Sequence, residues 1–254
     1  MYEFSSLDGF SGSKKLPADA MKINGEYIED LVEGYEQLVV SGRSIMPQEV
    51  TYIETPSRDG GHGVKTHTKP RILTIQYKLE ALTSSELREQ YSVLNSVLRG
   101  VLEITFDDDI GWKYTGYLNS VDAPEENALS MVASFTIICV DPYAYSDVKT
   151  DNPVQLEYAQ RITPDKITVR GSNVDNLKIS NGTDELTIFG GHTTNDTIII
   201  EWAKEEVFVT KNGNNALTSL SWLSVPEVFY LEKGTTITVS NGTLISVEWR
   251  DKKL

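Results

Sequence analysis

A chain of 254 residues with 39% hydrophobic residues is long enough to bury one large core or two modest ones. Its formal net charge of −14 argues against binding to phosphate backbones, which requires clustered lysine and arginine. The single cysteine, Cys139, has no partner for an internal disulfide, and neither a run of about 20 apolar residues nor a basic-then-apolar leader is present. We therefore expect a soluble, non-secreted protein without membrane insertion.

The first 55 residues contain short apolar runs separated by turn residues. Asn24 and Gly25 form a strong hairpin signal, because both residues tolerate positive φ. The pattern predicts strands at residues 21–23, 27–28, 35–40 and 49–53.

Residues 57–70 show no periodicity and are polar, glycine-rich and basic. This composition predicts a long mobile loop that orders only against a partner. Alternation resumes at residues 72–79, where Leu73, Ile75 and Tyr77 point to one side of a predicted strand.

The clearest helix signal lies between Thr83 and Gly100. Thr83 and Glu86 have the spacing of a capping box, and Gly100 stands where a C-terminal cap belongs. Apolar residues recur between them at helical spacing, namely Leu87, Tyr91, Leu94 and Leu98. One helix packed on a sheet is therefore expected in the first half of the chain.

A hairpin is predicted next, with arms at residues 101–106 and 112–121. Its turn carries Asp107, Asp108 and Asp109. Consecutive residues at a hairpin tip rarely all point at one ion, and no calcium-loop pattern is present, so a solvated or repulsive turn is favoured over a cation site.

Residues 131–139 form the strand on which we expect the first half to be built. Every second residue is apolar, Cys139 included, so one face should be fully buried and the cysteine should be a small core residue. Asp141 and Pro142 end the strand, since proline gives no N–H to a ladder. The polar run that follows indicates an N-terminal domain at 1–146, a linker at 147–153 and a second domain at 154–254.

The pattern of the second domain predicts an antiparallel β-sandwich. Strands are predicted at residues 167–169, 177–179, 186–189, 197–202, 207–210, 228–231, 236–239 and 244–249. Trp202 shares parity with its inward neighbours, as Trp249 does with Ile245 and Val247, whereas Trp222 is the candidate for exposure.

Motifs that carry catalysis are missing from the sequence. The three histidines have no metal-ligand spacing, and residues 60–66 lack the spacing of a phosphate loop. No nucleophile elbow occurs, and Cys139 is in the wrong place for a nucleophile. We expect no enzymatic activity, no catalytic or metal site and no cofactor.

The order of these elements resembles the distal tail protein family of long-tailed phages and prophages of Gram-positive bacteria. The resemblance is carried by FTIICVDPY at residues 135–143, ISNGT at 179–183, VFYLEKGTTI at 228–237 and VEWR at 247–250. It implies a mainly β chain, with an N-terminal β-domain that has one helix and a β-hairpin, followed by a galectin-like sandwich.

The resemblance also implies a function. Members form a homo-hexameric ring at the virion tail tip, the baseplate hub, assembled in the bacterial cytoplasm. The ring joins the major tail (tube) protein to the tail-associated lysin or fibre and to receptor-binding or other baseplate proteins. DNA passes through its central channel without specific binding.

Two groups of residues fit this function. Asp107, Asp108 and Asp109 are candidates for lining the channel, because acid excess suits a lumen through which DNA moves. The loop at 57–70 is long enough to add to a neighbour's sheet, so its basic residues are candidate inter-subunit contacts. These are Arg58, His62, Lys65, His67 and Lys69.

A carbohydrate-binding protein that recognises cell-surface polysaccharide is the alternative. Sugar rings stack on exposed aromatic side chains, and Trp222 is the candidate glycan contact. Loss of glycan-array binding on Trp222→Ala would favour this function, whereas a hexamer without glycan affinity would favour the hub.

Overall fold

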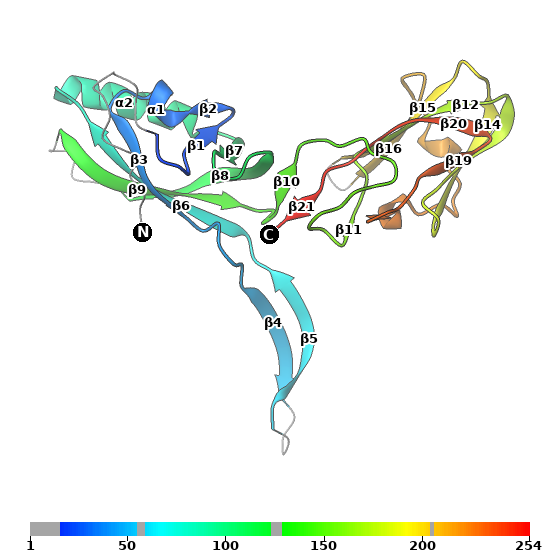
Figure 1. The fold of residues 1–254 in the computed structure, drawn as a ribbon, viewed down its shortest axis with the longest axis horizontal. Helices are drawn as coiled ribbons and strands as arrows, with labels where there is room; N and C mark the ends of the chain where they lie inside the picture. The colour runs from blue at the N-terminus through cyan, green and yellow to red at the C-terminus, as the bar shows by residue number, and fades with distance from the viewer. Residues whose placement is uncertain (1–15, 55–58, 123–128, 204–205) are drawn as a thin grey trace. The chain divides into compact units, whose positions relative to one another are not determined.

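The computed structural model describes residues 16–54, 59–122, 129–203 and 206–254, and the chain divides into two compact units, Met1–Pro142 and Tyr143–Leu254 (Figure 1). The division comes slightly before the expected one at residue 146. The segment 147–153, expected to be a linker, packs instead within the second unit. Lys149 exchanges two backbone hydrogen bonds with Trp249, and Val154 is fully buried just beyond the segment.

Seven strands of the first unit form one antiparallel sheet in the order β2-β1-β7-β8-β9-β6-β3. The strands are β1 (Met21–Ile23), β2 (Glu26–Tyr27), β3 (Tyr35–Ser41), β6 (Arg71–Glu80), β7 (Leu102–Phe106), β8 (Trp112–Asp122) and β9 (Ser130–Cys139). The predicted hairpin, with arms at residues 101–106 and 112–121, is confirmed as β7 and β8.

The centre of this sheet is the long pair β6 and β9. They are in register from Arg71 opposite Cys139 to Glu80 opposite Ser130. The inward residues of both strands are buried: Leu73, Ile75, Tyr77 and Leu79 on β6, and Met131, Ala133, Phe135, Ile137 and Cys139 on β9. The predicted alternation is confirmed on both strands, and burial raises the pKa of the Cys139 thiol to about 11.

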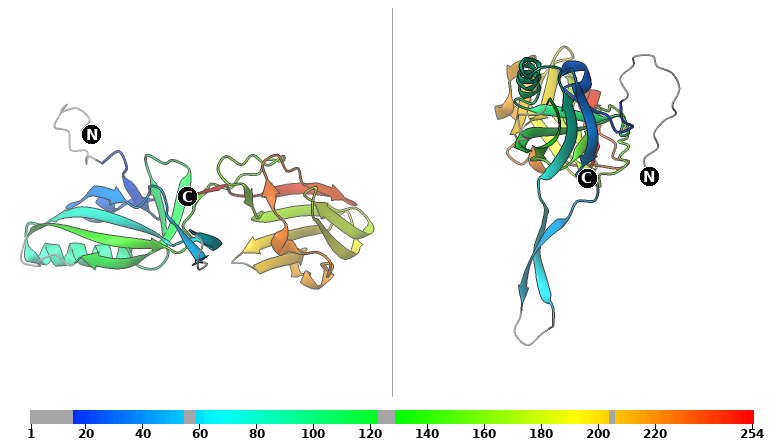
Figure 2. Two further views of the ribbon diagram at one scale, coloured as in Figure 1. Left: turned by 90° about the horizontal axis from the view of Figure 1, so that it is seen from below. Right: turned by 90° about the vertical axis from the view of Figure 1, so that its left-hand side faces the viewer.

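Among the described residues of the first unit, two helices accompany the sheet. The predicted helix is α2 (Ser84–Val97), at whose start Thr83 Oγ1 accepts a hydrogen bond from Glu86 N at 3.2 Å. Figure 2 shows α2 lying along one face of the sheet. The other helix, α1 (Ile28–Leu31), is a single turn, where a strand had been predicted at residues 27–28.

The two ends of the sheet are linked by one side chain. Gln37 of β3 accepts a hydrogen bond from Met21 N at 3.0 Å and donates one to Asp19 O at 3.0 Å, although β3 and β1 stand far apart in the strand order. Gln37 therefore connects β3 to the segment that enters β1.

Strands β4 (Gln48–Glu54) and β5 (Gly61–Thr68) form a separate antiparallel ribbon, which we call the ribbon (Figure 1). The prediction of a mobile loop at 57–70 is therefore wrong over residues 61–68. Neither face of the ribbon is buried, so the sequence has no reason to alternate there, and the periodicity by which strands are recognised is absent.

The two larger antiparallel sheets of the second unit have the orders β17-β16-β15-β12-β20 and β14-β13-β19. Their strands are β12 (Lys166–Gly171), β13 (Val174–Ser180), β14 (Glu185–His192), β15 (Thr197–Ala203), β16 (Glu206–Lys211), β17 (Asn214–Asn215), β19 (Thr238–Ser240) and β20 (Gly242–Glu248). Side chains from both sheets, such as Ile167 and Leu177, share one buried core. The predicted sandwich is confirmed.

Short elements complete this unit. They are β10 (Ala144–Ser146), β11 (Arg161–Ile162), β18 (Leu231–Glu232), β21 (Lys252–Lys253) and the 3-10 turns η1 (Leu217–Ser219) and η2 (Pro226–Val228). The strand predicted at 228–231 is mostly wrong, because η2 extends to Val228 and the strand begins only at Leu231.

A β-bulge changes which side chains of β20 point inward. The register between β12 and β20 shifts between Thr168 and Val169, leaving Ile245 as the extra residue. Ile245 is consequently 48% exposed, which contradicts its expected core position, whereas Val247 and Trp249 are buried as predicted. Trp202 is partly buried and donates from Nε1 to Pro226 O at 2.9 Å.

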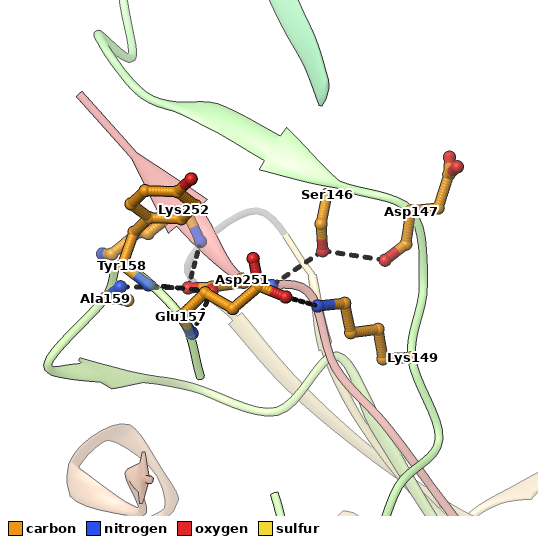
Figure 3. Close-up of polar contacts among 8 residues, drawn as sticks. All are labelled: Ser146, Asp147, Lys149, Glu157, Tyr158, Ala159, Asp251 and Lys252. Atoms are coloured by element: carbon orange, nitrogen blue, oxygen red, sulfur yellow. Dashed lines mark hydrogen bonds and ion pairs between the residues drawn. The ribbon is translucent and has the colours of Figure 1, made fainter. Parts of the chain in front are cut away.

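A buried carboxylate joins the first and last segments of the second unit (Figure 3). Asp251 has no exposed surface and accepts four backbone N–H bonds of 2.7 to 3.1 Å, from Glu157, Tyr158, Ala159 and Lys252. Burial alone would raise its pKa, but these donors outweigh burial and the pKa is lowered. Beside it, β10 pairs with β21.

Candidate assembly surfaces

The ribbon continues the hairpin formed by β3 and β6, and it exposes nearly all of its residues. His62, Lys65 and His67 lie on β5 and Lys69 follows directly, so the structure brings four of the predicted inter-subunit residues onto one edge of the ribbon. Arg58 lies outside the described residues.

An acid on β4 balances part of this basic edge. Glu49 Oε2 lies 3.3 Å from His67 Nε2 and 3.1 Å from Lys69 Nζ. All three side chains are about half exposed, so the contacts contribute little to stability.

Large apolar side chains are also exposed on the ribbon. Val50, Tyr52, Ile53 and Val64 have between 49% and 62% of their surface exposed. A two-stranded ribbon is only marginally stable in water, so these exposed apolar side chains favour packing of the ribbon against another surface. Sequence reasoning placed residues 49–53 in a strand but missed this surface, because the four side chains follow no single-face pattern.

The root of the ribbon is held by Arg71, a fully buried arginine that the sequence did not single out. Its Nη1 donates to Gly42 O at 2.6 Å and its Nε donates to Pro142 O at 3.0 Å. Gly42 itself has φ of +96°, and a Cβ there would lie 2.0 Å from Ile72 O. The backbone at the root of the ribbon is therefore held by packed residues.

Two carboxylates in the acidic turn between β7 and β8, those of Asp107 and Asp108, contact cationic or hydroxyl groups. Asp107 accepts hydrogen bonds from Tyr27 Oη at 2.6 Å and from Lys22 Nζ at 2.9 Å, and the pKa of its carboxyl group is lowered, mainly by the tyrosine. Asp108 forms a two-pronged ion pair with Arg43, with N···O distances of 2.5 and 2.6 Å.

The same turn is also folded tightly on itself. Asp109 N donates to Phe106 O, and the guanidinium of Arg43 lies 4.2 Å from the centre of the Phe106 ring. Asp107 and Asp108 are therefore partly neutralised by cations of the first unit, and the acid excess expected of a channel surface is smaller here than the sequence suggests.

The candidate glycan residue lies in the second unit on a braced turn. Trp222 is 87% exposed and the adjacent Leu223 is 70% exposed. Ser224 Oγ accepts from Thr187 N at 2.9 Å, and Ser221 N donates to Thr187 O at 2.8 Å, which ties the turn to β14. Trp222 and Leu223 are therefore two large exposed apolar side chains on a turn whose backbone is held by hydrogen bonds.

Neither a metal-ligand cluster nor a membrane-spanning helix is found in residues 16–54, 59–122, 129–203 and 206–254. No group of three or more His, Cys, Asp or Glu side chains in those ranges is arranged to hold a metal ion. None of the helices in those ranges has the length and apolar character needed to cross a membrane.

The chain is similar in fold to solved phage proteins. The Dit protein of phage SPP1, described as a paradigm of the hub adsorption apparatus in phages that infect Gram-positive bacteria, matches with a TM-score of 0.77 and 18% identity. The match covers 92% of this chain and 99% of that chain. This chain has the fold of the SPP1 Dit protein.

The baseplate of phage p2 in its activated conformation contains further matches. Chains from the calcium and strontium forms match with a TM-score of 0.53 and with 9% and 10% identity, covering 87% of this chain and 91% of each of those chains. No family model and no curated protein matches the sequence. The resemblance indicated by the sequence motifs is thus confirmed for the fold.

Proposed function

We propose that this chain is a non-enzymatic structural protein of a phage tail, acting as the distal hub of the baseplate. The observation that carries the proposal is the fold shared with the SPP1 Dit protein along nearly the whole of both chains. In this proposal six copies close into a ring through their first units, the second units project outward, and DNA passes through the central channel.

The partners follow from this position. The ring contacts the tail tube protein on one face and the tail-associated lysin or fibre on the other, and it carries receptor-binding or other baseplate proteins. The ribbon, with His62, Lys65, His67 and Lys69 at its edge, is the element that we assign to contacts between copies. Its full exposure supports this role, because a lone ribbon gains stability by packing on another surface.

Light scattering on the purified chain tests the ring directly. The expected mass is that of six copies, with a central hole visible by negative-stain electron microscopy. A monomer at every concentration, also when mixed with the tail tube protein, would contradict the proposal.

The acidic turn remains our proposal for part of the channel surface. Asp109→Lys is the suitable variant, because it leaves the contacts of Asp107 with Lys22 and of Asp108 with Arg43 in place. Rings should still form, and genome ejection should be slower. Ejection at the normal rate would remove the turn from the channel.

Binding of cell-surface polysaccharide is the second candidate function, favoured by the exposed ring of Trp222. A glycan array compared between the native chain and Trp222→Ala tests it. Binding that is lost in the variant would support this function, and no binding by the native chain would exclude it for the glycans tested.

A further inference from the structure

A cavity of about 80 Å³ lies between the two larger sheets of the second unit. Its walls come from β14 of one sheet, from β15 and β16 of the other, and from the segment around η1. Phe189, Gly190 and Gly191 line it and are exposed, so the cavity opens to solvent beside the end of β14. We call this cavity the β14 pocket.

His192 is the buried polar residue of the β14 pocket, with only 2% of its surface exposed. Its Nε2 lies 3.2 Å from Ile188 O, and because a carbonyl oxygen can only accept, Nε2 carries the proton. Nδ1 of the neutral ring is then a hydrogen-bond acceptor, and none of the described residues donates to it. Because a buried acceptor without a donor costs free energy, His192 favours a ligand that donates a hydrogen bond.

The other walls favour an uncharged ligand. Ile188 and Ile198 are buried and give the β14 pocket an apolar side. Lys211 is the one cation among the lining residues, and its Nζ donates to Gly191 O at 2.6 Å and lies 3.1 Å from Asp196 Oδ2. An anion would therefore meet a lysine that is already paired and the lone pair of a histidine nitrogen. A hydroxyl group, by contrast, can donate to that lone pair.

The volume of the β14 pocket limits the size of the ligand group. One water requires roughly 10–15 Å³, and an engineered cavity that binds benzene has roughly 150 Å³. The 80 Å³ of the β14 pocket lie between these values. The pocket can therefore hold a hydroxymethyl group and the carbon atoms next to it, but it cannot enclose a whole sugar ring.

We propose that the β14 pocket binds the terminal hydroxymethyl group of a sugar or polyol, whose hydroxyl donates to His192 Nδ1 while its carbon atoms contact Ile188 and Ile198. This inference deepens the second candidate function, polysaccharide binding, and rests on it for the natural ligand, but it does not depend on the ring. The turn that carries Trp222 is hydrogen-bonded to Thr187, the residue before Ile188 in β14. The exposed ring and the pocket are thus both attached to β14.

Glycerol is the probe for the β14 pocket, and the ring nitrogens of His192 report on it. Long-range ¹H–¹⁵N spectra of the whole chain, labelled at histidine, distinguish Nδ1 from Nε2. Glycerol should shift the Nδ1 resonance of His192 in a saturable way, while His62 and His67, which are exposed on the ribbon, should not respond. Dimethoxyethane is similar in size but has no hydroxyl donor, so it should not shift that resonance. No shift with glycerol, or equal shifts with both probes, would overturn the inference.

Two variants test the assignment of the site. His192→Phe keeps a ring but removes the acceptor, and it should weaken glycerol binding, measured by the amide shift of Gly191, by roughly tenfold or more. The control is His67→Phe, the same change on the ribbon, which should bind glycerol like the native chain. Ala216→Leu places a larger side chain in the wall of the pocket and removes no polar group. It should abolish binding without lowering the melting temperature, and unchanged glycerol affinity in this variant would contradict the assignment.

A glycan array separates the pocket from the second candidate function. Glycan binding that is lost in both His192→Phe and Trp222→Ala would support a saccharide as the ligand. Glycan binding that is lost in Trp222→Ala but kept in His192→Phe would overturn the inference and leave the second candidate function standing. Saturable glycerol binding by a chain that binds no glycan would support the pocket with a free polyol as its ligand, and it would exclude the second candidate function for the glycans tested.

Discussion

Asp251 illustrates how a single buried carboxylate organises chain segments that are far apart in sequence. Its two oxygens accept N–H groups from residues 157–159 and from Lys252, and its own N–H donates to Ser146 Oγ at 3.0 Å (Figure 3). A neutral amide cannot satisfy the same set of donors, because its NH₂ group would face them.

Asp251→Asn is therefore expected to lower the free energy of unfolding by about 1–3 kcal/mol. Urea titration of the whole chain, followed by tryptophan fluorescence, measures the change. Asp175→Asn, at an exposed position of β13, is the control and should change the midpoint little.

The same residue predicts a pH dependence. The lowered pKa of Asp251 means that its stabilising contribution is fully present above the unfolded value of about 3.9 and is lost as the pH falls through the folded value. The stability difference between the native chain and Asp251→Asn should be constant from neutral pH to about 5 and should shrink below about 4. A difference that grows on acidification would mean that the carboxylate is not held as an anion.

At the scale of elements, α2 depends on its cap. Thr83→Ala removes the hydrogen bond from Glu86 N to Oγ1 and should lower stability by about 1 kcal/mol. Ser84→Ala, one residue later and equally exposed, removes a hydroxyl without a capping role and serves as the control in thermal melts.

The turn into the ribbon depends on Gly42. Gly42→Ala would place a methyl group 2.0 Å from Ile72 O in a positive-φ conformation, so the backbone must move and stability should fall by about 1–3 kcal/mol or more. Gly63→Ala, within β5 and with no atom near its Cβ position, should be close to neutral. Equal melting temperatures for the two variants would contradict this account of the ribbon root.

These elements also show how far the sequence could be interpreted. Strand β9 and helix α2 each bury one face, so their periodicity and caps predicted them correctly. The ribbon buries neither face, and the exposure of Ile245 depends on a bulge, which no periodic pattern encodes. Among the site residues, the predicted exposure of Trp222 is confirmed. The ion pairs of Asp107 with Lys22 and of Asp108 with Arg43 join residues that are distant in sequence, so no local pattern predicts them.

At the scale of the whole molecule, the first unit does not depend on the ribbon for its buried core. The residues of the ribbon contribute nothing to the buried core of the first unit. Replacing residues 46–68 by a short glycine-containing turn should leave the melting temperature nearly unchanged. Light scattering should then give the mass of a single chain, whereas the mass of the native assembly would show that other surfaces suffice.

The pairing of β10 with β21 sets the order in which the second unit matures during translation. Residues 144–146 leave the ribosome about a hundred residues before their partners at 251–253, at a synthesis rate of roughly 5–20 residues per second. For several seconds β10 of the nascent second unit therefore lacks its partner strand β21. The strands of the first unit lie within residues 21–139 and are already available to fold. The sheet of the first unit can therefore be complete before the second unit closes.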